Sequence, residues 1–246
     1  MTPGSRTAAS GTPGADHASY NASYVGRGVH KVAVEALALR IFDGTYEEGD
    51  TLDLPQLMAD LDVSQTVLRE AIKVLTTKGL LDARQKRGTF VRPRDDWNLL
   101  DTDVLRWKLA AGAPNDFFAD LLELRRSIEP AAAALAAEHR TDEDLAALDA
   151  ALAAMAAYDK DPVLAVRADA SFHTALLSAS GNRFFAQMRR VIIPALVARD
   201  RHVHAGTHDD PLPVHTTVVE RVRDGDPDGA YHAMLELLDM AMRDHP

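Results

Sequence analysis

Residues 51–91 read TLDLPQLMADLDVSQTVLREAIKVLTTKGLLDARQKRGTFV, and apolar side chains recur in the first part at helical spacing. The spacing predicts a short helix over Leu52–Leu61. The polar turn Asp62–Ser64 ends in a serine, which is a preferred N-cap residue. A second apolar stripe then predicts a longer helix over Gln65–Lys78.

The same stretch ends in a β pattern. Gly79 stops the second helix, and Leu80–Val91 predicts a small hairpin with Arg87 and Gly88 at its tip. Two helices joined by a tight turn and followed by a hairpin are typical of a winged helix-turn-helix, a module that binds duplex DNA.

The polar face of the second helix predicts contacts to DNA, because the first turn of a recognition helix reaches base edges. A glutamine there can pair with adenine, and an arginine with guanine or phosphate. An ordinary amphipathic helix in a small bundle is the alternative, but it would not account for the turn, the cap and the basic hairpin together. The predicted DNA-binding residues are Ser64, Gln65, Thr66, Arg69, Lys73, Arg87 and Gly88.

Charge is distributed unevenly along the chain. The net charge of the whole chain is −10. Residues 64–94 nevertheless carry eight lysines and arginines against two acids, whereas residues 95–246 carry 15 against 26. A basic patch on an acidic body predicts phosphate contact by the basic part, although a solvated charged face is the alternative.

The length of 246 residues allows two domains. We expect a disordered tail over residues 1–24, a DNA-binding domain over 25–94, and a linker with a connecting helix over 95–114. The remainder, residues 115–246, is expected to be an all-helical effector-binding domain. The chain has no cysteine, no apolar run approaching the ~18 residues of a membrane span, and no signal-peptide core, so we expect a cytoplasmic protein without membrane contact.

The region from Asp101 on, called the body below, shows helical periodicity only. Breaks rich in glycine, proline and polar residues separate about seven predicted helices in it, and Pro194 is expected to kink one of them. The predicted fold class is therefore mostly α, with an N-terminal winged helix-turn-helix and a C-terminal all-α helical bundle.

An aspartate and a histidine four residues apart predict a candidate metal site. Asp169 and His173 share one helix face, and a carboxylate with imidazoles suits Zn, Ni, Mn or Fe alike. His215, at the start of a later predicted helix, could supply a third ligand. The alternative for the first pair is a simple hydrogen bond. Further histidines at 202, 204 and 208 are also candidates, and we interpret His204 and His208 as solvated loop residues.

The residues around the second helix resemble the DNA-binding head of the GntR family of bacterial regulators. The run VSQTVLREAIKVLTTKGLLDARQKRGTFV matches the family pattern at most of its defining positions. Two positions depart from it, because Gln65 and Pro55 stand where the family often has arginine. The resemblance therefore implies an operator unlike the family's commonest sites.

The body resembles the FCD effector domain of the FadR-like branch. The run ELRRSIEP at residues 123–130 resembles its opening, and the run DASFH at residues 169–173 is similar to its most specific motif. The resemblance implies a divalent metal held by Asp169, His173 and His215. A fourth histidine of some members would fall near Leu237, which cannot bind metal.

The resemblance also implies an effector. Arg125 is the arginine typical of the first effector helix, and Arg243 lies where the last helix can face the effector. The junction Trp97–Trp107 is similar to that of FCD regulators of sugar-acid catabolism, so a small carboxylate such as a sugar acid is expected. The alternatives are an ion pair of Arg125 with Glu129, and compensation of the helix dipole by Arg243.

These features predict a ligand-responsive repressor that acts as a homodimer on a palindromic DNA operator. The alternatives are a metal-dependent enzyme in a helical bundle, and an architectural DNA-binding protein with an inert body. The body has no G-x-S-x-G or H-E-x-x-H run, and an enzyme would not need the basic head, so we expect no enzymatic activity.

Overall fold

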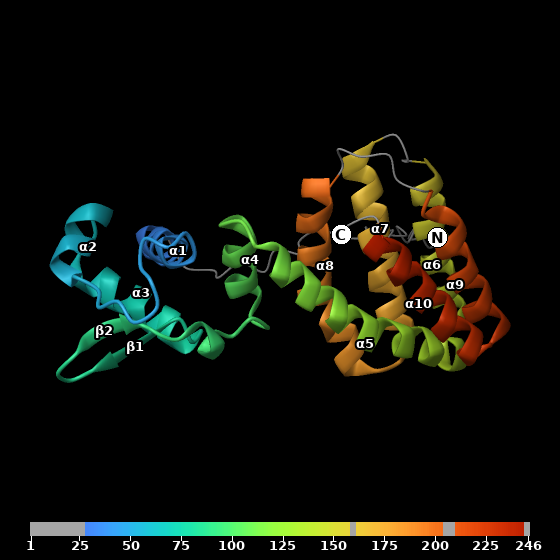
Figure 1. The fold of residues 1–246 in the computed structure, drawn as a ribbon, viewed down its shortest axis with the longest axis horizontal. Coiled ribbons are helices and arrows are strands. Elements are labelled where there is room, and N and C mark those ends of the chain that lie inside the picture. Colours follow the sequence, from blue (N-terminus) through green and yellow to red (C-terminus); the bar gives the residue numbers. More distant parts are fainter. Residues whose placement is uncertain (1–27, 158–160, 204–209, 244–246) are drawn as a thin grey trace, which may run out of the picture.

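The protein consists of a small head and a larger helical bundle with one helix between them (Figure 1). The computed structural model describes residues 28–157, 161–203 and 210–243, without the side chains of 199–203 and 241–243. The predicted tail over residues 1–24 lies outside these ranges. Among the described helices, none combines the length and the apolar character that a membrane span needs.

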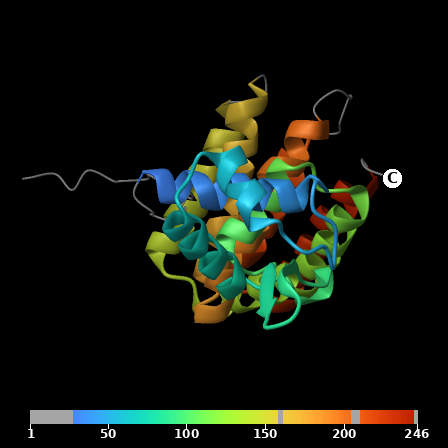
Figure 2. The same ribbon diagram turned by 90° about the vertical axis from the view of Figure 1, so that its left-hand side faces the viewer.

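The head contains three helices and a hairpin, and the second and third helices and the hairpin are those that the sequence predicts. The elements are α1 (Val29–Phe42), α2 (Leu54–Leu61), α3 (Gln65–Thr77), β1 (Leu81–Arg84) and β2 (Gly88–Val91). Figure 2 views the molecule from the head side, so that α1, α2, α3 and the hairpin lie in front of the bundle. The strands pair antiparallel, from Leu81 opposite Val91 to Arg84 opposite Gly88.

The predicted start of α2 is wrong by two residues. Leu52 is not helical, because its backbone N–H donates to the carbonyl of Thr89 at 2.8 Å and Thr51 bridges to Phe90. The chain therefore runs beside β2 before Asp53 caps the helix with its side chain. The predicted end of α3 is one residue late, since Lys78 is its C-cap.

The segment after the hairpin is packed onto the head rather than extended as a free linker. Gly79 lies so close to it that an added Cβ would approach the carbonyl oxygen of Asp96 to 2.6 Å. Trp97, which follows the short 3-10 helix η1 (Arg94–Asp96), donates from Nε1 to the carbonyl of Arg92 and packs edge-on against Phe42.

The connecting helix α4 (Thr102–Ala110) belongs to two hydrophobic cores. Val104 and Trp107 are fully buried in the core of the head, with residues of α1 and α3. Leu105, on the other side of α4, packs with Leu121 and Val191 of the bundle. The helix therefore joins the head to the bundle through side-chain packing as well as through the chain.

The bundle contains six further helices, so that the region after Asp101 has the predicted seven within the described residues. They are α5 (Asn115–His139), α6 (Asp142–Ala157), α7 (Pro162–Ala179), α8 (Arg183–Val203), α9 (Leu212–Asp224) and α10 (Pro227–Arg243). Helix α7 packs against α5, α6 and α8, and α10 packs against α5 and α9. Helix α8 runs on through Pro194. Alanines of α5 and α7 allow these helices to approach closely around the core.

Candidate DNA interface and candidate metal centre

The turn before α3 fixes the orientation of that helix. Asp62 adopts a left-handed conformation with a φ of 49°, and the Ser64 Oγ accepts a hydrogen bond from the backbone N–H of Val67 at 3.4 Å. Leu68 and Leu75 on the opposite side of α3 are buried in the head. The polar face of α3 therefore points away from the rest of the protein.

The predicted DNA-binding residues of α3 all lie on its exposed face. Ser64, Gln65, Thr66, Arg69 and Lys73 are exposed. Within the described part of the chain, the side chains of Gln65 and Arg69 make no hydrogen bond or ion pair. Lys73 donates to Glu70 at 2.6 Å, and this hydrogen bond and the lysine's charge lower the pKa of Glu70.

Arg87 and Gly88 lie at the tip of the hairpin, as the sequence predicts. Gly88 has a φ of 82°, which allows the tight turn. Arg87 folds back, because its Nη2 donates to the carbonyl of Gly49 at 2.7 Å and its guanidinium lies 3.8 Å above the Phe90 ring. The side chain is nevertheless exposed, and these two contacts fix its orientation. DNA binding by all seven residues stays a prediction.

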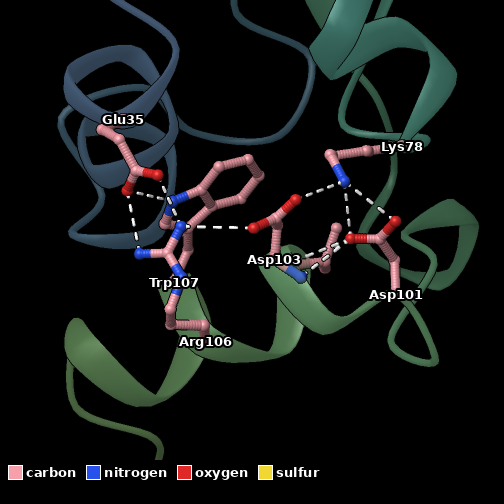
Figure 3. Close-up of polar contacts among 7 residues, drawn as sticks. Glu35, Lys78, Asp101, Asp103, Arg106 and Trp107 are labelled. Carbon is pink, nitrogen blue, oxygen red and sulfur yellow. Dashed lines mark hydrogen bonds and ion pairs between the residues drawn. The ribbon is translucent and has the colours of Figure 1, made fainter. Parts of the chain in front are cut away.

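Figure 3 shows the polar contacts that attach α4 to the head, which sequence analysis did not predict. Glu35 of α1 accepts hydrogen bonds from Arg106 at 2.9 and 2.5 Å and from the Trp107 Nε1 at 2.7 Å. Burial alone would raise the pKa of Glu35, but the donors Arg106 and Trp107 lower it below its usual value. The ionised carboxylate is thus the form that holds α4.

A second ion-pair cluster lies beside the first (Figure 3). The Lys78 Nζ, at the end of α3, contacts Asp101 and Asp103 at 2.8 Å each. Burial alone would lower the pKa of Lys78, but the two carboxylates raise it. Asp101 also caps α4 by accepting from the backbone N–H groups of Asp103 and Val104. The end of α3 and the start of α4 therefore share one carboxylate.

The predicted metal-binding residues come together in the bundle. Asp169 and His173 lie on α7, and His215 lies in the first turn of α9. The Asp169 Oδ1 is 3.1 Å from the His215 Nε2 and 3.5 Å from the His173 Nε2. One ligand atom from each of the three lies within 4.8 Å of the others. Both histidines are buried, whereas the Asp169 side chain is 22% exposed.

The remaining ring nitrogens orient the two imidazoles. The His215 Nδ1 lies 2.7 Å from the carbonyl oxygen of Pro211, and the His173 Nδ1 lies 3.0 Å from the Glu129 Oε2. The Pro211 carbonyl is a hydrogen-bond partner of the His215 Nδ1, whereas the Glu129 carboxylate lies beside the His173 Nδ1 at ion-pair distance without hydrogen-bond geometry. Both oxygens favour a proton on Nδ1, which leaves each Nε2 directed at the carboxylate of Asp169. One carboxylate and two such imidazoles fit a divalent cation of the Zn, Ni, Mn or Fe type.

Electrostatics in this region are dominated by buried charges. Burial alone would lower the pKa of His173, but Glu129 and Asp169 raise it to about 9. Burial would also raise the pKa values of both acids, yet the pKa of Asp169 is held well below its usual range by His173 and His215. The two carboxylates therefore remain ionised, and they favour positive charge at this point of the bundle.

Arg125 forms the buried ion pair that the sequence offered as an alternative to effector binding. Its Nε donates to the Glu129 Oε1 at 2.9 Å, and its Nη2 lies 3.0 Å from the His173 Nε2. The effector role of Arg125 stays a prediction, and the ion pair places its guanidinium directly beside the candidate metal site.

The described structure does not test the other sequence candidates, apart from the position of Leu237. Leu237, at the position of the missing fourth histidine, is buried in the bundle core. Arg243 is the last residue of α10, and its side chain lies outside the described part of the chain, as does that of His202. His204 and His208 are also outside the described residues.

A winged helix-turn-helix joined to an all-helical bundle defines the class of two-part DNA-binding regulators. Comparison with known families agrees, because "Bacterial regulatory proteins, gntR family" matches residues 30–91 and "FCD domain" matches residues 120–240. With the relatives described next, this shows that the chain belongs to the GntR family of transcriptional regulators, in the branch with an FCD domain. Members of the family are regulators that bind DNA operators and are not enzymes.

Individual relatives match along most of the chain. The chain is 31% identical to the galactonate operon transcriptional repressor of Escherichia coli, over 85% of this chain and 93% of that protein. It is 29% identical to the transcriptional repressor NanR of Salmonella arizonae, over 77% of this chain and 74% of that protein. A solved structure of Lar, which controls the expression of the Listeria monocytogenes agr system, has a similar fold, with a TM-score of 0.55, 19% identity, and coverage of 89% of this chain and 98% of that one.

Replacing Arg69 with alanine should weaken operator binding by about 1–3 kcal/mol, because the exposed guanidinium lies in the first part of α3, where base edges and phosphates are reached. Fluorescence anisotropy on a duplex selected from a random pool with the unaltered protein would measure this. Arg167→Ala, an exposed site on α7, is the matched control and should have no effect. Equal affinities of the two variants would remove Arg69 from the interface.

The combined substitution of His173 and His215 by alanine should abolish binding of zinc, nickel or manganese in the bundle, because Asp169 alone cannot hold a divalent ion tightly. Metal content after dialysis against each ion, measured by inductively coupled plasma mass spectrometry, tests this. His232→Ala, at an exposed site on α10, should retain the metal content of the unaltered protein. Full metal content in the double variant would place the ion elsewhere.

Proposed function

We propose that this protein is a repressor that releases its DNA operator when a small hydroxy acid, such as a sugar acid, binds beside a divalent metal ion in the bundle. One observation carries the proposal: the ligand atoms of Asp169, His173 and His215 converge, and the guanidinium of Arg125 lies 3.0 Å from the nearest imidazole nitrogen. The name of the galactonate operon repressor supports both the direction of control and the class of effector.

The chemistry of the cluster suits an anionic ligand with more than one oxygen. Three protein ligands would leave coordination positions of a divalent ion open to carboxylate and hydroxyl oxygens. The guanidinium of Arg125 carries five N–H donors, and Arg–carboxylate contacts are often bidentate. Exposure of the Asp169 side chain connects the cluster to solvent. A neutral sugar would lack the charge that this site is suited to bind.

Helix α5 provides a physical connection from this cluster to the head. Arg125 lies one turn after Leu121, which packs with Leu105 of α4. Helix α4 in turn is attached to α1 through Glu35. A ligand that shifts α5 at Arg125 would therefore shift α4 and the head with it. Such a ligand changes DNA affinity only if it binds the two arrangements with different affinities.

We propose a homodimer as the form that binds DNA. One recognition helix contacts only a few base pairs, whereas two heads related by a two-fold axis can bind the two halves of a palindrome. Because the spacing of the half-sites on DNA is fixed by the double helix, a change in the separation of the heads would weaken binding. This gives small movements of α4 a large effect on operator affinity.

Release of DNA by an acid is the experiment that tests the function. D-galactonate, added with zinc or manganese, should raise the dissociation constant for the operator by about 5–150-fold, which is the usual range of coupling between two sites. Galactose is the matched control, since it lacks the carboxylate. Anisotropy titrations measure the affinity, and thermal unfolding reports binding of the acid.

An architectural DNA-binding protein with an inert body would behave differently. Operator affinity and melting temperature would then be unchanged by galactonate and by a panel of other aldonates, uronates and dicarboxylates. That result would contradict the proposed function, because a true ligand at 100 times its dissociation constant stabilises the folded state by about 2.7 kcal/mol.

A further inference from the structure

Glu129 is a fully buried carboxylate that lies between the candidate metal ligands and the candidate acid-binding arginine. Its side chain is 0% exposed, and its neighbours Arg125 and His173 are 2% and 1% exposed. The Oε1 accepts from the Arg125 Nε at 2.9 Å, whereas the Oε2 lies 3.0 Å from the His173 Nδ1. One carboxylate thus contacts both parts of the site through different oxygens.

Glu129 and Arg125 form an ion pair inside the bundle, where neither side chain is more than 2% exposed. A buried ion pair is costly to desolvate and can often be replaced by apolar side chains without loss of stability. Stability alone is therefore a weak explanation for a carboxylate at this position.

The contact with Glu129 favours one tautomer of the His173 ring. A metal ion binds the neutral form of an imidazole, and in that form a carboxylate beside Nδ1 favours the proton on Nδ1, so that the lone pair is on Nε2. The Nε2 is the nitrogen that lies 3.5 Å from the Asp169 Oδ1. Without the carboxylate, the opposite tautomer would place a proton on the nitrogen that must bind the ion.

The contact with Arg125 fixes the guanidinium beside the same nitrogen. The Arg125 Nη2 lies 3.3 Å from the Glu129 Oε2 and 3.0 Å from the His173 Nε2. An ion bound to this Nε2 would replace the contact between Arg125 and His173, while the Nε of Arg125 could remain on Glu129. The guanidinium would then lie beside the ion, with its orientation set by Glu129.

We propose that Glu129 is a positioning residue that orients His173 for the metal and Arg125 for the acid, and that it thereby couples the binding of the two. The inference rests on the proposed function for the identity of the acid, but its metal part does not depend on that identity. It assigns Glu129 a role beyond an ion pair that stabilises the fold.

Zinc affinity of the Glu129→Gln variant tests the proposal. Competition with a chromophoric chelator should show zinc binding about 10–100-fold weaker than in the unaltered protein, the usual effect of losing such a supporting carboxylate. Glu123→Gln lies on the same helix at an exposed position and should bind zinc normally. Nitrogen-15 NMR of the variant with one equivalent of zinc should also show a measurable fraction of His173 rings whose Nε2 is not coordinated by the ion.

A zinc affinity within twofold of the unaltered protein, together with an unchanged His173 spectrum, would overturn the proposal. If Glu129→Gln does not fold, Glu129→Asp retains the charge but withdraws the oxygens, and the same loss of zinc affinity is expected. An unaltered protein that binds no zinc would also overturn it. Failure of galactonate to bind would contradict the proposed function while the zinc measurement still decides the role of Glu129.

Discussion

The attachment of α4 to the head through Glu35 is the constraint on which the account of this protein depends. Arg106 and Trp107, neighbours on α4, both donate to this one carboxylate of α1. The side chain of Trp107 is fully buried, so its replacement by alanine would lower the free energy of unfolding by about 3–5 kcal/mol. The partly exposed Glu35–Arg106 ion pair contributes about 1 kcal/mol or less. Packing of Trp107 therefore provides the strength of the attachment, and Glu35 provides its orientation.

Because α4 is held in this way, the boundary between head and bundle does not lie where the chain looks most like a linker. The sequence predicts a linker and connecting helix from residue 95 on, yet Asp96 lies against Gly79 and Trp97 packs on the core of the head. Movement between the two parts would instead involve the side of α4 that faces the bundle, where Leu105 meets Leu121 of α5. That interface is apolar, and among the contacts of the described residues it has no carboxylate that orients it as Glu35 orients the head side. It is therefore better suited to two alternative packings than the head side.

Much of the fold followed from sequence because its signals are local. Helical periodicity, the Ser64 cap and the glycine stop predicted the recognition helix and its surroundings, and the spacing of Asp169 and His173 placed two candidate ligands on one helix face. The start of α2 was missed because pairing of Leu52 with Thr89 is a tertiary hydrogen bond that outweighs helical spacing. Sequence analysis missed the role of Glu35 for the same reason, because its partner Arg106 lies 71 residues away in the chain.

Some roles could not be decided from spacing. Arg125 and Glu129 lie four residues apart, which is compatible with an ion pair and with an arginine free for a ligand. Only the packing of α7 against α5 brings His173 to both of them. Arg87 lies at the hairpin tip, as expected from sequence, but contacts with Gly49 and Phe90, which sequence analysis did not predict, fold its side chain back. Packing between distant parts of the chain thus determines which contacts the side chains of the predicted residues make.

The central claim is that occupancy of the bundle changes DNA binding through the attachment of α4 to α1. The most direct measurement is the ratio of operator affinities without and with saturating galactonate, compared between the unaltered protein and Glu35→Ala, with the exposed Glu47→Ala as control. The account predicts that the ratio falls towards one in Glu35→Ala only, while the thermal shift caused by galactonate is retained. An undiminished ratio in a folded Glu35→Ala protein would contradict it.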